Sequence, residues 1–274
     1  APPLPVVLRA TSKAALEDLG AIGGIPQPRT VECSAADVSG GLAVPTPAVV
    51  KPIRSEVQTG ETMLHRTVVF ADTVAEVATA LRQLPDGRGL VQERVGGTVV
   101  TVDGLAWQGR VVCSLQKEAL RLWPADGGAV PYVRTIASDS LSDAARVVLR
   151  ELAWSGPFNL QVVRGPTGDR LIDLNPRAPD SLGLAQKAGM DLAVQWCDLL
   201  LGGTSRSATA RIGVRWRSEE EEWWALVAAV RQHRWRDAVG IVRPHRRTAH
   251  AVWALSDPRP ALLLRKRLLG RHRR

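Results

Sequence analysis

The stretch LIDLNPRAPDSLGLAQKAG, Leu171–Gly189, has the pattern of a strand that stops at a proline and is followed by a helix. Asp173, Asn175 and Arg177 occupy alternate positions, with apolar residues between the first two. Because successive side chains of a strand point to opposite faces, this spacing places polar groups on one face. Pro176 cannot donate to a strand ladder and is expected to end the strand. The sequence therefore predicts a strand with one polar and one apolar face.

The segment just upstream predicts the other half of a hairpin. Its middle, GPTGD (Gly165–Asp169), is rich in turn-forming residues, and we expect a five-residue loop closed by Arg164 and Arg170. The pairs expected across the ladder are Gln161 with Asp173 and Asn159 with Asn175. Side chains that are directly opposed lie about 5 Å apart on the same face. The opposite, apolar face is expected to carry Leu160, Val162, Ile172 and Leu174.

The polar face of this hairpin has the chemistry of a site for a hard divalent cation. Amide oxygens and one carboxylate suit Mg²⁺, with Mn²⁺ as the alternative ion, and nucleotide phosphates commonly complete the coordination shell. Arg177 follows two residues after Asn175, within reach of the same phosphates. The ordinary alternative is a hairpin whose polar side faces only solvent.

Two further segments bear on a nucleotide site. Lys51 ends the apolar strand predicted at Ala48–Pro52, a common place for a phosphate contact and also for an ordinary surface lysine. LVQERV (Leu90–Val95) predicts a strand that runs into Gly96-Gly97. The exit of such a strand can offer backbone groups to a base.

Composition limits the class of protein. The chain has 274 residues and is 45% hydrophobic, which suffices for a large core. It lacks an apolar run of the roughly 20 residues that a bilayer span needs, and a secretory signal, so we expect a cytoplasmic protein. The net charge of +9 favours an anionic partner. Three scattered cysteines and five scattered histidines give no zinc spacing and no disulfide framework.

Hydrophobic periodicity predicts helices between the strands. Amphipathic helices are expected in ADTVAEVATALRQL and SLSDAARVVLRELAW, and a short helix capped by Thr11 or Ser12 is expected to stop at Gly20. Two strands and a third long helix, ending at LLLGG, complete this part. Strands and helices mixed without a strict βαβ rhythm favour the α+β class.

The segment from Thr204 onward differs in composition and is rich in Arg and Trp. Ser218 and Glu221 predict a capping box, and the four glutamates Glu219–Glu222 are interpreted as a solvated helix start, with a cation site as the alternative. The last helix is expected after Ser256 or Asp257 and before Gly270. We favour docking of its leucines on the protein body over an amphipathic contact with an anionic membrane.

Taken in order along the chain, these motifs resemble the ATP-grasp superfamily. SKAALEDLGAIGGIPQPRT is similar to its entry helix and turn, VVKP to its phosphate-binding lysine strand, and LVQERVGG to its adenine hinge. NLQVV and LIDLNPRAPDSLGLAQKAG resemble its metal-binding strands and following helix. The closest resemblance is to the carbamoyl-phosphate-synthase-like carboxylate–amine ligases, where a glutamine also replaces the first acidic ligand. Asp173 stands where that family usually has glutamate.

The resemblance implies a role for each matching residue. The implied metal ligands are Gln161, Asp173 and Asn175. The implied nucleotide contacts are Lys13, Lys51, Gln92, Glu93, Arg94, Val95 and Arg121, the hinge residues acting through their backbones at adenine. Arg177 and Lys51 are the implied catalytic residues. The resemblance also implies an upstream domain of about 100 residues, which is expected to have been cut away or left out ahead of Ala1. It further implies a glycine-rich lid, and the matching segment Ile53–Met63 has a single glycine.

The sequence thus predicts an ATP-grasp fold of two lobes that close on a nucleotide, residues 1–88 and 89–203, with a basic helical extension at 204–274. The expected activity is ATP- and Mg²⁺-dependent ligation of a small-molecule carboxylate to an amine. One alternative is a degenerate or regulatory nucleotide-binding module without turnover. The other is a basic nucleic-acid-binding protein, which is supported by charge alone.

Overall fold

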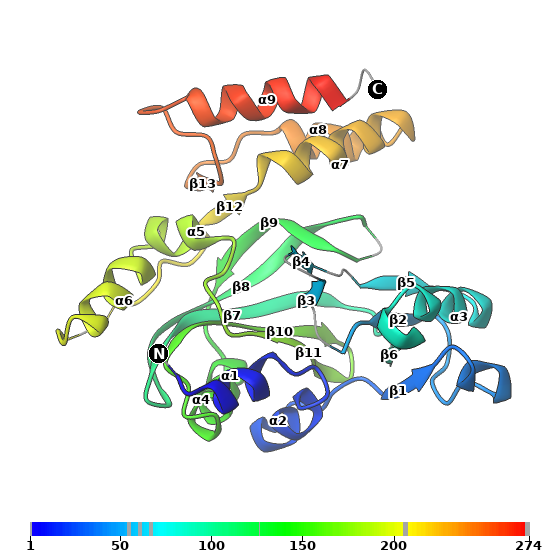
Figure 1. The fold of residues 1–274 in the computed structure, drawn as a ribbon. Coiled ribbons are helices and arrows are strands. Elements are labelled where there is room, and N and C mark those ends of the chain that lie inside the picture. The colour runs from blue at the N-terminus through cyan, green and yellow to red at the C-terminus, as the bar shows by residue number, and fades with distance from the viewer. Residues whose placement is uncertain are drawn as a thin grey trace. The chain divides into compact units, whose positions relative to one another are not determined.

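The computed structural model of the chain describes residues 2–53, 56–59, 62–65, 68–125, 127–204 and 208–271. These residues form a mixed α+β fold, as expected (Figure 1). The helices are α1 (Leu4–Thr11), α2 (Leu16–Gly23), α3 (Val74–Arg82), α4 (Ser140–Glu151), α5 (Leu182–Lys187), α6 (Leu192–Leu200), α7 (Glu219–Arg231), α8 (Trp235–Val242) and α9 (Arg259–Arg271). Short 3-10 turns lie at Asp37–Gly40 and Pro85–Gly87.

The strands follow the same chain order. They are β1 (Thr30–Ser34), β2 (Ala48–Lys51), β3 (Glu56–Thr59), β4 (Thr62–His65), β5 (Val69–Ala71), β6 (Arg88–Glu93), β7 (Thr98–Trp107), β8 (Arg110–Trp123), β9 (Ala129–Ile136), β10 (Gly156–Gly165), β11 (Gly168–Asn175), β12 (Arg215–Arg217) and β13 (Thr248–His250). β3 pairs with β4 in the region of the expected lid, where residues 54, 55, 60 and 61 lie outside the described residues.

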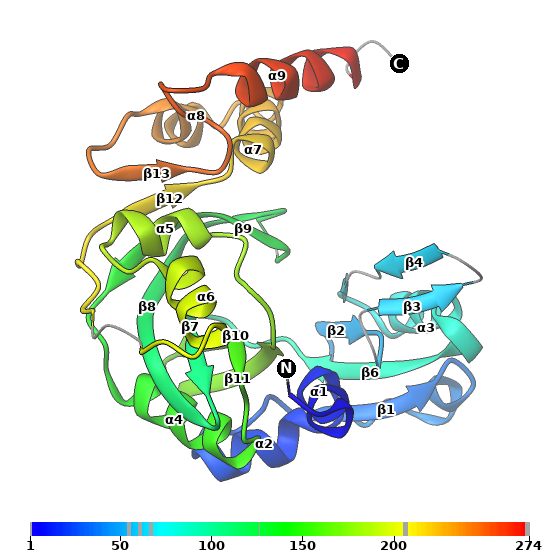
Figure 2. The same ribbon diagram turned by 60° about the vertical axis from the view of Figure 1, so that its left-hand side comes forward.

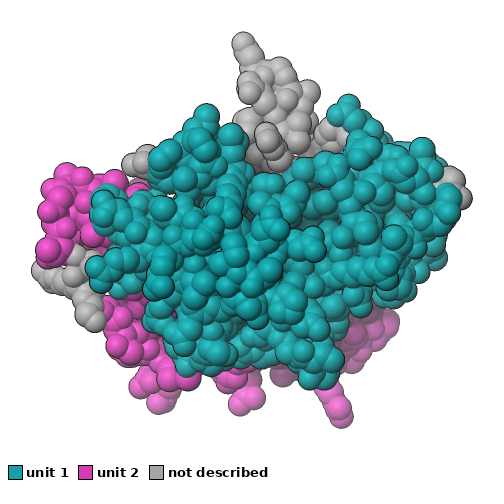
Figure 3. All heavy atoms as spheres, turned by 90° about the horizontal axis from the view of Figure 1, so that it is seen from below, with its two compact units in different colours: residues 1–112, 138–178 teal, residues 113–137, 179–274 magenta. Residues whose placement is uncertain are grey.

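The chain divides into two compact units (Figure 3). Unit 1 contains residues 1–112 and 138–178, and unit 2 contains residues 113–137 and 179–274. This division differs from the lobes and extension expected from the sequence, whose boundaries stay predictions. Each unit is described by itself below.

In unit 1, a four-stranded antiparallel sheet with the order β1-β6-β2-β5 is covered by α3 (Figure 2). Thr73 caps α3 by accepting a hydrogen bond from the backbone of Glu76, as a helix start requires. The apolar stripe of α3 packs on buried strand residues, among them Val50 and Val91. The predicted helix after Asp72 and the predicted strand at Ala48 are thereby confirmed.

Unit 1 also contains the antiparallel strands β11, β10 and β7 in adjacent order. Helices α2 and α4 pack on them. The predicted stop of the first helix at Gly20 is wrong: α2 runs on to Gly23, and Gly24 closes it in the left-handed conformation with φ of 70°. Glycine suits this closing position because it has no Cβ to clash there.

The hairpin β10–β11 has the predicted pairs at its site end and a different turn. Gly165 pairs with Gly168, so the turn has two residues, not the five expected. A β-bulge at Ile172 then shifts the register by one residue, which restores the predicted pairs Gln161 with Asp173 and Asn159 with Asn175. The buried apolar face accordingly carries Leu171 with Leu160, Val162 and Leu174, whereas Ile172 is half-buried.

In unit 2, strands β8, β9, β12 and β13 lie in adjacent order, and β12 pairs with β13 in parallel. The third long helix predicted from the sequence is two helices, α5 and α6, because Gly189 takes a φ of 96° between them. Helices α7 and α8 pack through a small core of Ala225, Ala229, Ala238 and Ile241.

The last helix, α9, continues past Gly270, so the predicted end at that glycine is wrong. Asp257 accepts a hydrogen bond from the backbone of Arg259, which supports the predicted cap. Leu268 is 5% exposed and Leu263 is 66% exposed, so the leucines of this helix are only partly docked. None of the helices within the described residues is long and apolar enough to cross a membrane.

Candidate metal and nucleotide site

The polar face of the hairpin β10–β11 brings together all three predicted metal ligands. Gln161 and Asp173 are cross-strand partners, and Asn175 lies two pairs further along on the same face, opposite Asn159. Pro176 follows directly after the strand end and explains why β11 stops there. Gln161, Asp173 and Asn175 are half-buried, which leaves them accessible from one side. Their role as ligands of a metal stays a prediction.

Asn159 links the amides of this face into one network. Its carbonyl oxygen accepts hydrogen bonds from Gln161 Nε2 at 2.8 Å and from Asn175 Nδ2 at 3.1 Å. Its own Nδ2 donates to Asp103 Oδ1 at 2.5 Å. Asn159 is 6% exposed and therefore lies beneath the accessible part of the face.

Asp103 is a residue of this cluster that the sequence interpretation missed. It lies on β7 directly opposite Asn159 and is only 1% exposed. A carboxylate this deeply buried needs strong hydrogen-bond partners, because desolvating a charge is costly. The signal in the sequence was a single charged residue, Asp103, inside the mainly apolar run TVVTVDGLAW, Thr98–Trp107.

Two lysines reach the same face. Lys13 Nζ lies 3.1 Å from Asp173 Oδ1, and its side chain is 9% exposed. Lys51 Nζ donates to the backbone carbonyl of Ile172 at 2.9 Å. Ile172 is the bulge residue, whose carbonyl is displaced from the regular ladder and so can accept this bond. The structure thus places the predicted residues Lys13 and Lys51 beside Asp173.

Burial lowers the pKa of Lys51, the lysine at the end of β2. Desolvation lowers the pKa of Lys51 to about 8, Lys13 adds to that lowering, and Asp173 opposes it. Lys51 is only 8% exposed and has one carbonyl acceptor among the described residues, which is less than a full shell for an ammonium group. An anionic ligand such as a phosphate would supply the missing charge.

The donor set fits Mg²⁺ better than a softer metal. Asp173 Oδ1 accepts from Lys13 and from the backbone of Leu174, whereas Oδ2 has no hydrogen-bond partner among the described residues. The described residues also contain no cluster of three His, Cys, Asp or Glu side chains. One carboxylate with amide oxygens is a typical hard-ion set that leaves positions for water and phosphate.

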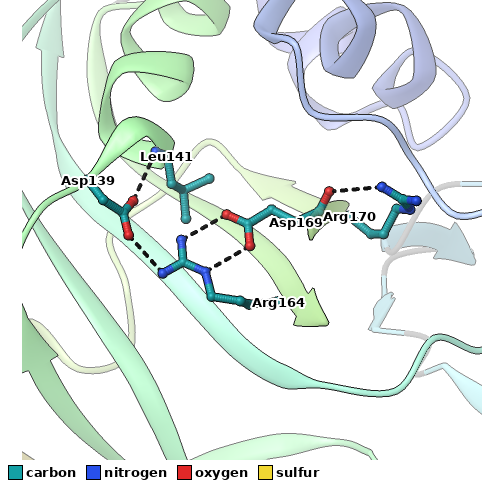
Figure 4. A network of polar contacts seen from close by, with 5 residues as sticks. All are labelled: Asp139, Leu141, Arg164, Asp169 and Arg170. Atoms are coloured by element: carbon teal, nitrogen blue, oxygen red, sulfur yellow. Dashed lines mark hydrogen bonds and ion pairs between the residues drawn. The ribbon is translucent and has the colours of Figure 1, made fainter. Parts of the chain in front are cut away.

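The far end of the hairpin is fixed by Arg164, as Figure 4 shows. Its guanidinium binds both carboxylate oxygens of Asp169 at 2.8 Å and one oxygen of Asp139 at 2.8 Å. These bonds raise the pKa of Arg164 further above its usual range. Asp139 also caps α4 through the backbone N–H of Leu141. Arg164 therefore ties the turn of the hairpin to the start of α4.

The predicted adenine hinge lies at the end of β6. Gln92 is buried and donates to Thr30, so its side chain holds β6 to β1. The backbone N–H groups of Glu93 and Arg94 bond to the carbonyls of Arg29 and Pro47. No hydrogen bond of the Val95 backbone N–H is seen among the described residues. Binding of a base at Val95 stays a prediction.

A glycine is required just after this hinge. A Cβ on Gly97 would lie 2.4 Å from the carbonyl oxygen of Arg164, and the φ of Gly97 is 153°. The absence of a side chain lets the hinge exit pass close to the hairpin. Gly97 thus couples the position of the hinge to that of the hairpin within unit 1.

Two other predicted residues form contacts with residues outside this cluster. Arg177 is exposed just beyond the end of β11 and donates to the carbonyl of Ala178 at 3.2 Å. Arg121 belongs to unit 2, where its guanidinium forms an ion pair with Glu222. A contact of Arg121 with phosphates or substrate stays a prediction.

The glutamate run at the start of α7 is not a simple solvated helix start, contrary to the sequence interpretation. Glu222 is 4% exposed, and Arg217 Nε lies 3.3 Å from its Oε2, close enough for an ion pair but not aligned as a hydrogen bond. Burial raises the pKa of Glu222, while Arg121 and Arg217 oppose that rise. Both arginines also lie over the ring of Tyr132. Ser218 bonds the side chain of Glu221 and does not cap the backbone.

Comparison with known proteins bears on the family and the fold. Residues 87–222 match the family model described as ATP-grasp in the biosynthetic pathway with Ter operon. None of the curated proteins matches the chain.

Several solved structures share the fold at low sequence identity. Phosphoribosylamine–glycine ligase from Thermotoga maritima matches with 13% identity and a TM-score of 0.59, over 77% of this chain and 59% of that one. N5-carboxyaminoimidazole ribonucleotide synthetase from Thermus thermophilus matches with 18% identity and a TM-score of 0.58, over 78% and 58%. L-amino acid ligase from Bacillus licheniformis matches with 14% identity and a TM-score of 0.54, over 72% and 49%.

The fold is therefore the ATP-grasp fold. The family model matches residues 87–222, just under half of the chain, so the chain is similar to ATP-grasp proteins in this region. The chain spans about half to three fifths of the length of these solved structures.

Proposed function

We propose that this protein is an ATP- and Mg²⁺-dependent ligase that joins a carboxylate to an amine through an acyl phosphate. The observation that supports it most is the single face shared by Asp173, Gln161, Asn175, Lys13 and Lys51. One carboxylate, two amides and two ammonium groups form the set that a metal–triphosphate needs. The proposed adenine hinge at Glu93–Val95 belongs to the same unit as this face.

In the proposed reaction an oxygen of the substrate carboxylate attacks the γ-phosphorus of ATP, and ADP leaves. The amine then attacks the carbonyl carbon of the acyl phosphate, and inorganic phosphate leaves as the amine loses a proton. Enzymes catalyse such phosphoryl transfers mainly by positioning groups and neutralising charge. This chemistry requires no covalent nucleophile from the protein.

The chain's own residues would supply positioning and charge. Lys13 and Lys51 would bind phosphate oxygens, and the fixed position of Lys51 on the bulge carbonyl would orient its ammonium group. Arg177 would hold the triphosphate or the acyl phosphate from its exposed position after β11. The backbones at Glu93 and Val95 would bind the adenine edge, with Gln92 and Arg94 holding the hinge in place.

Asp173, Gln161 and Asn175 would hold the Mg²⁺. When bound, the ion neutralises phosphate charge and so favours transfer of the γ-phosphoryl group. Gln161 in place of the first acidic ligand supports a carbamoyl-phosphate-synthase-like subgroup as the finer proposal, whereas Asp173 in place of glutamate departs from that subgroup.

Isotope exchange tests this function before the amine is identified. ATP labelled with ¹⁸O in the β–γ bridge is incubated with the protein, Mg²⁺ and each member of a panel of carboxylic acids. A reversible acyl-phosphate step moves the label to the β-nonbridging position only with a true substrate. Phosphate release with a panel of amines then identifies the acceptor.

The same experiment separates the alternative of a degenerate or regulatory module. Such a module binds the Mg²⁺–nucleotide complex and shows neither isotope exchange nor phosphate release with any pair of substrates. Nucleotide binding without either signal would overturn the ligase proposal while leaving the nucleotide site intact.

A second candidate function rests on charge. Residues 204–274 carry 17 Lys and Arg against six Asp and Glu, whereas the rest of the chain has 19 against 21. The whole positive excess therefore lies in the predicted extension. Binding of DNA or RNA that falls steeply as salt is raised would support a nucleic-acid-binding role.

A further inference from the structure

The buried carboxylate of Asp103 has a specific consequence for the amides above it. An ionised carboxylate can only accept hydrogen bonds, so the group of Asn159 that faces it must be the NH₂ group. Asn159 Nδ2 donates to Asp103 Oδ1 at 2.5 Å, a short hydrogen bond to a carboxylate oxygen. Asp103 thereby fixes which way the amide of Asn159 points.

The orientation passes on to the next two amides. Since Asn159 turns its NH₂ group down to Asp103, its oxygen faces Gln161 and Asn175 and accepts from both, at 2.8 and 3.1 Å. Each of these residues must then present its NH₂ group to Asn159. The carbonyl oxygens of Gln161 and Asn175 have no other hydrogen-bond partner among the described residues and are left for a ligand.

We propose that Asp103 is a positioning residue for the metal site: through Asn159 it orients Gln161 and Asn175 so that their carbonyl oxygens, and not their NH₂ groups, face the cation. The proposal rests on the proposed function, because it requires that Gln161, Asp173 and Asn175 bind Mg²⁺. An amide flipped at either ligand position would present donors to a cation and repel it. Asp103 itself is too buried to reach the ion.

The chain offers a conservative variant and a matched control. Asp103→Asn keeps an oxygen that can accept from Asn159, whereas Asp103→Leu removes it. Thr101 lies on the same strand opposite Gln161, is 4% exposed, and has no hydrogen bond to this network, so Thr101→Val perturbs a similarly buried position. Asp173→Ala removes the carboxylate of the site directly.

The test measures Mn²⁺ binding by electron paramagnetic resonance, in the presence of a non-hydrolysable ATP analogue, for the whole chain and its variants. Asp103→Leu is expected to raise the Kd for Mn²⁺ by about 10- to 100-fold, the usual effect of losing an outer-shell partner. The Kd of Asp103→Asn for Mn²⁺ is expected to stay within about threefold of the wild-type value. Thr101→Val should leave the Kd for Mn²⁺ unchanged. The affinity for metal-free AMP should not change in any of these variants.

The outcomes separate the two proposals. Wild-type Mn²⁺ affinity in Asp103→Leu, or equal losses in Asp103→Asn and Asp103→Leu, would overturn the positioning role. Unchanged affinity in Asp173→Ala would instead overturn the metal site on which the role depends. Should Asp103→Leu fail to fold, hydrogen exchange of side-chain amides in the wild-type protein decides: the Asn159 NH₂ group must be strongly protected, and exchange as fast as for an exposed amide would contradict the proposal.

Discussion

Asp173 in unit 1 and Glu222 in unit 2 are both carboxylates beside two cationic side chains, yet their surroundings differ. The side chain of Asp173 is 25% exposed and has one oxygen with no hydrogen-bond partner among the described residues, with Lys13 bound to the other. Glu222 is 5% exposed at its side chain and lies between Arg121 and Arg217, which hold one oxygen each. The first carboxylate is open to a ligand, and the second is enclosed by protein.

This difference in surroundings distinguishes a candidate binding site from a structural ion cluster. Lysine is a compact charge on a flexible stem and can release a carboxylate to a metal ion, whereas arginine fits a carboxylate with several fixed donors. A buried cluster in which arginines and a carboxylate pair with one another stabilises the local fold only while every charged partner is present. We therefore expect substitutions at Glu222 to change stability and substitutions around Asp173 to change binding.

The largest expected effect is on stability, at Glu222. Glu222→Gln removes the charge that Arg121 and Arg217 share, and loss of one partner of a buried ion cluster typically costs about 3–5 kcal/mol. Thermal and urea unfolding should show this loss. The control is Glu220→Gln on the same helix, where the 3.9 Å contact to Arg267 is more exposed and the change should stay within about 0.5 kcal/mol. Equal losses would mean that Glu222 is no more enclosed than Glu220.

Lys51→Met should separate phosphate binding from folding. The variant keeps an apolar side chain in the buried position and loses the ammonium group, which is worth about 1.5–3 kcal/mol to a charged partner. Affinity for ATP should therefore fall by about 10- to 100-fold, and affinity for AMP should fall much less. Titration calorimetry with both nucleotides is the measurement. A similar loss for ATP and AMP would show that Lys51 acts only by holding the bulge of β11.

Leucines of α9 give the smallest expected change. Leu268 is buried and Leu263 is exposed, so Leu268→Ala should cost about 2 kcal/mol and Leu263→Ala less than about 0.5 kcal/mol of unfolding free energy. Neither variant should alter binding to anionic vesicles if the helix only docks on its own unit. Lower vesicle binding in Leu263→Ala would favour the membrane contact instead.

The pairing that builds the candidate site could be predicted from local pattern because alternation and turn composition both constrain a hairpin. The turn itself could not: a two-residue turn with a bulge at Ile172 gives the same pairs at Gln161 and Asn159 as a five-residue loop without one. The pattern therefore predicted the correct cross-strand partners although it predicted the wrong turn length. It also missed that the bulge creates the carbonyl to which Lys51 binds.

The sequence interpretation failed mainly at contacts between segments that lie far apart in the chain, because local pattern does not predict them. Asp103 lies 56 residues before Asn159, and only the strand order β10-β7 brings them together. Glu222 lies 101 residues after Arg121, so a run of four glutamates could not show which one is buried. The helix break at Gly189 was missed because a glycine inside an apolar pattern does not by itself fix its φ.

We propose that the open carboxylate of Asp173 makes this face a site for a metal–nucleotide complex. Isothermal titration of Asp173→Ala with ATP, with and without Mg²⁺, tests this proposal directly. The matched control is Asp143→Asn, at an exposed aspartate of α4. We predict that Asp173→Ala keeps the wild-type melting behaviour and loses the Mg²⁺-dependent part of ATP affinity, by about 100-fold or more. Unchanged Mg²⁺-dependent affinity in a folded Asp173→Ala variant would contradict the account.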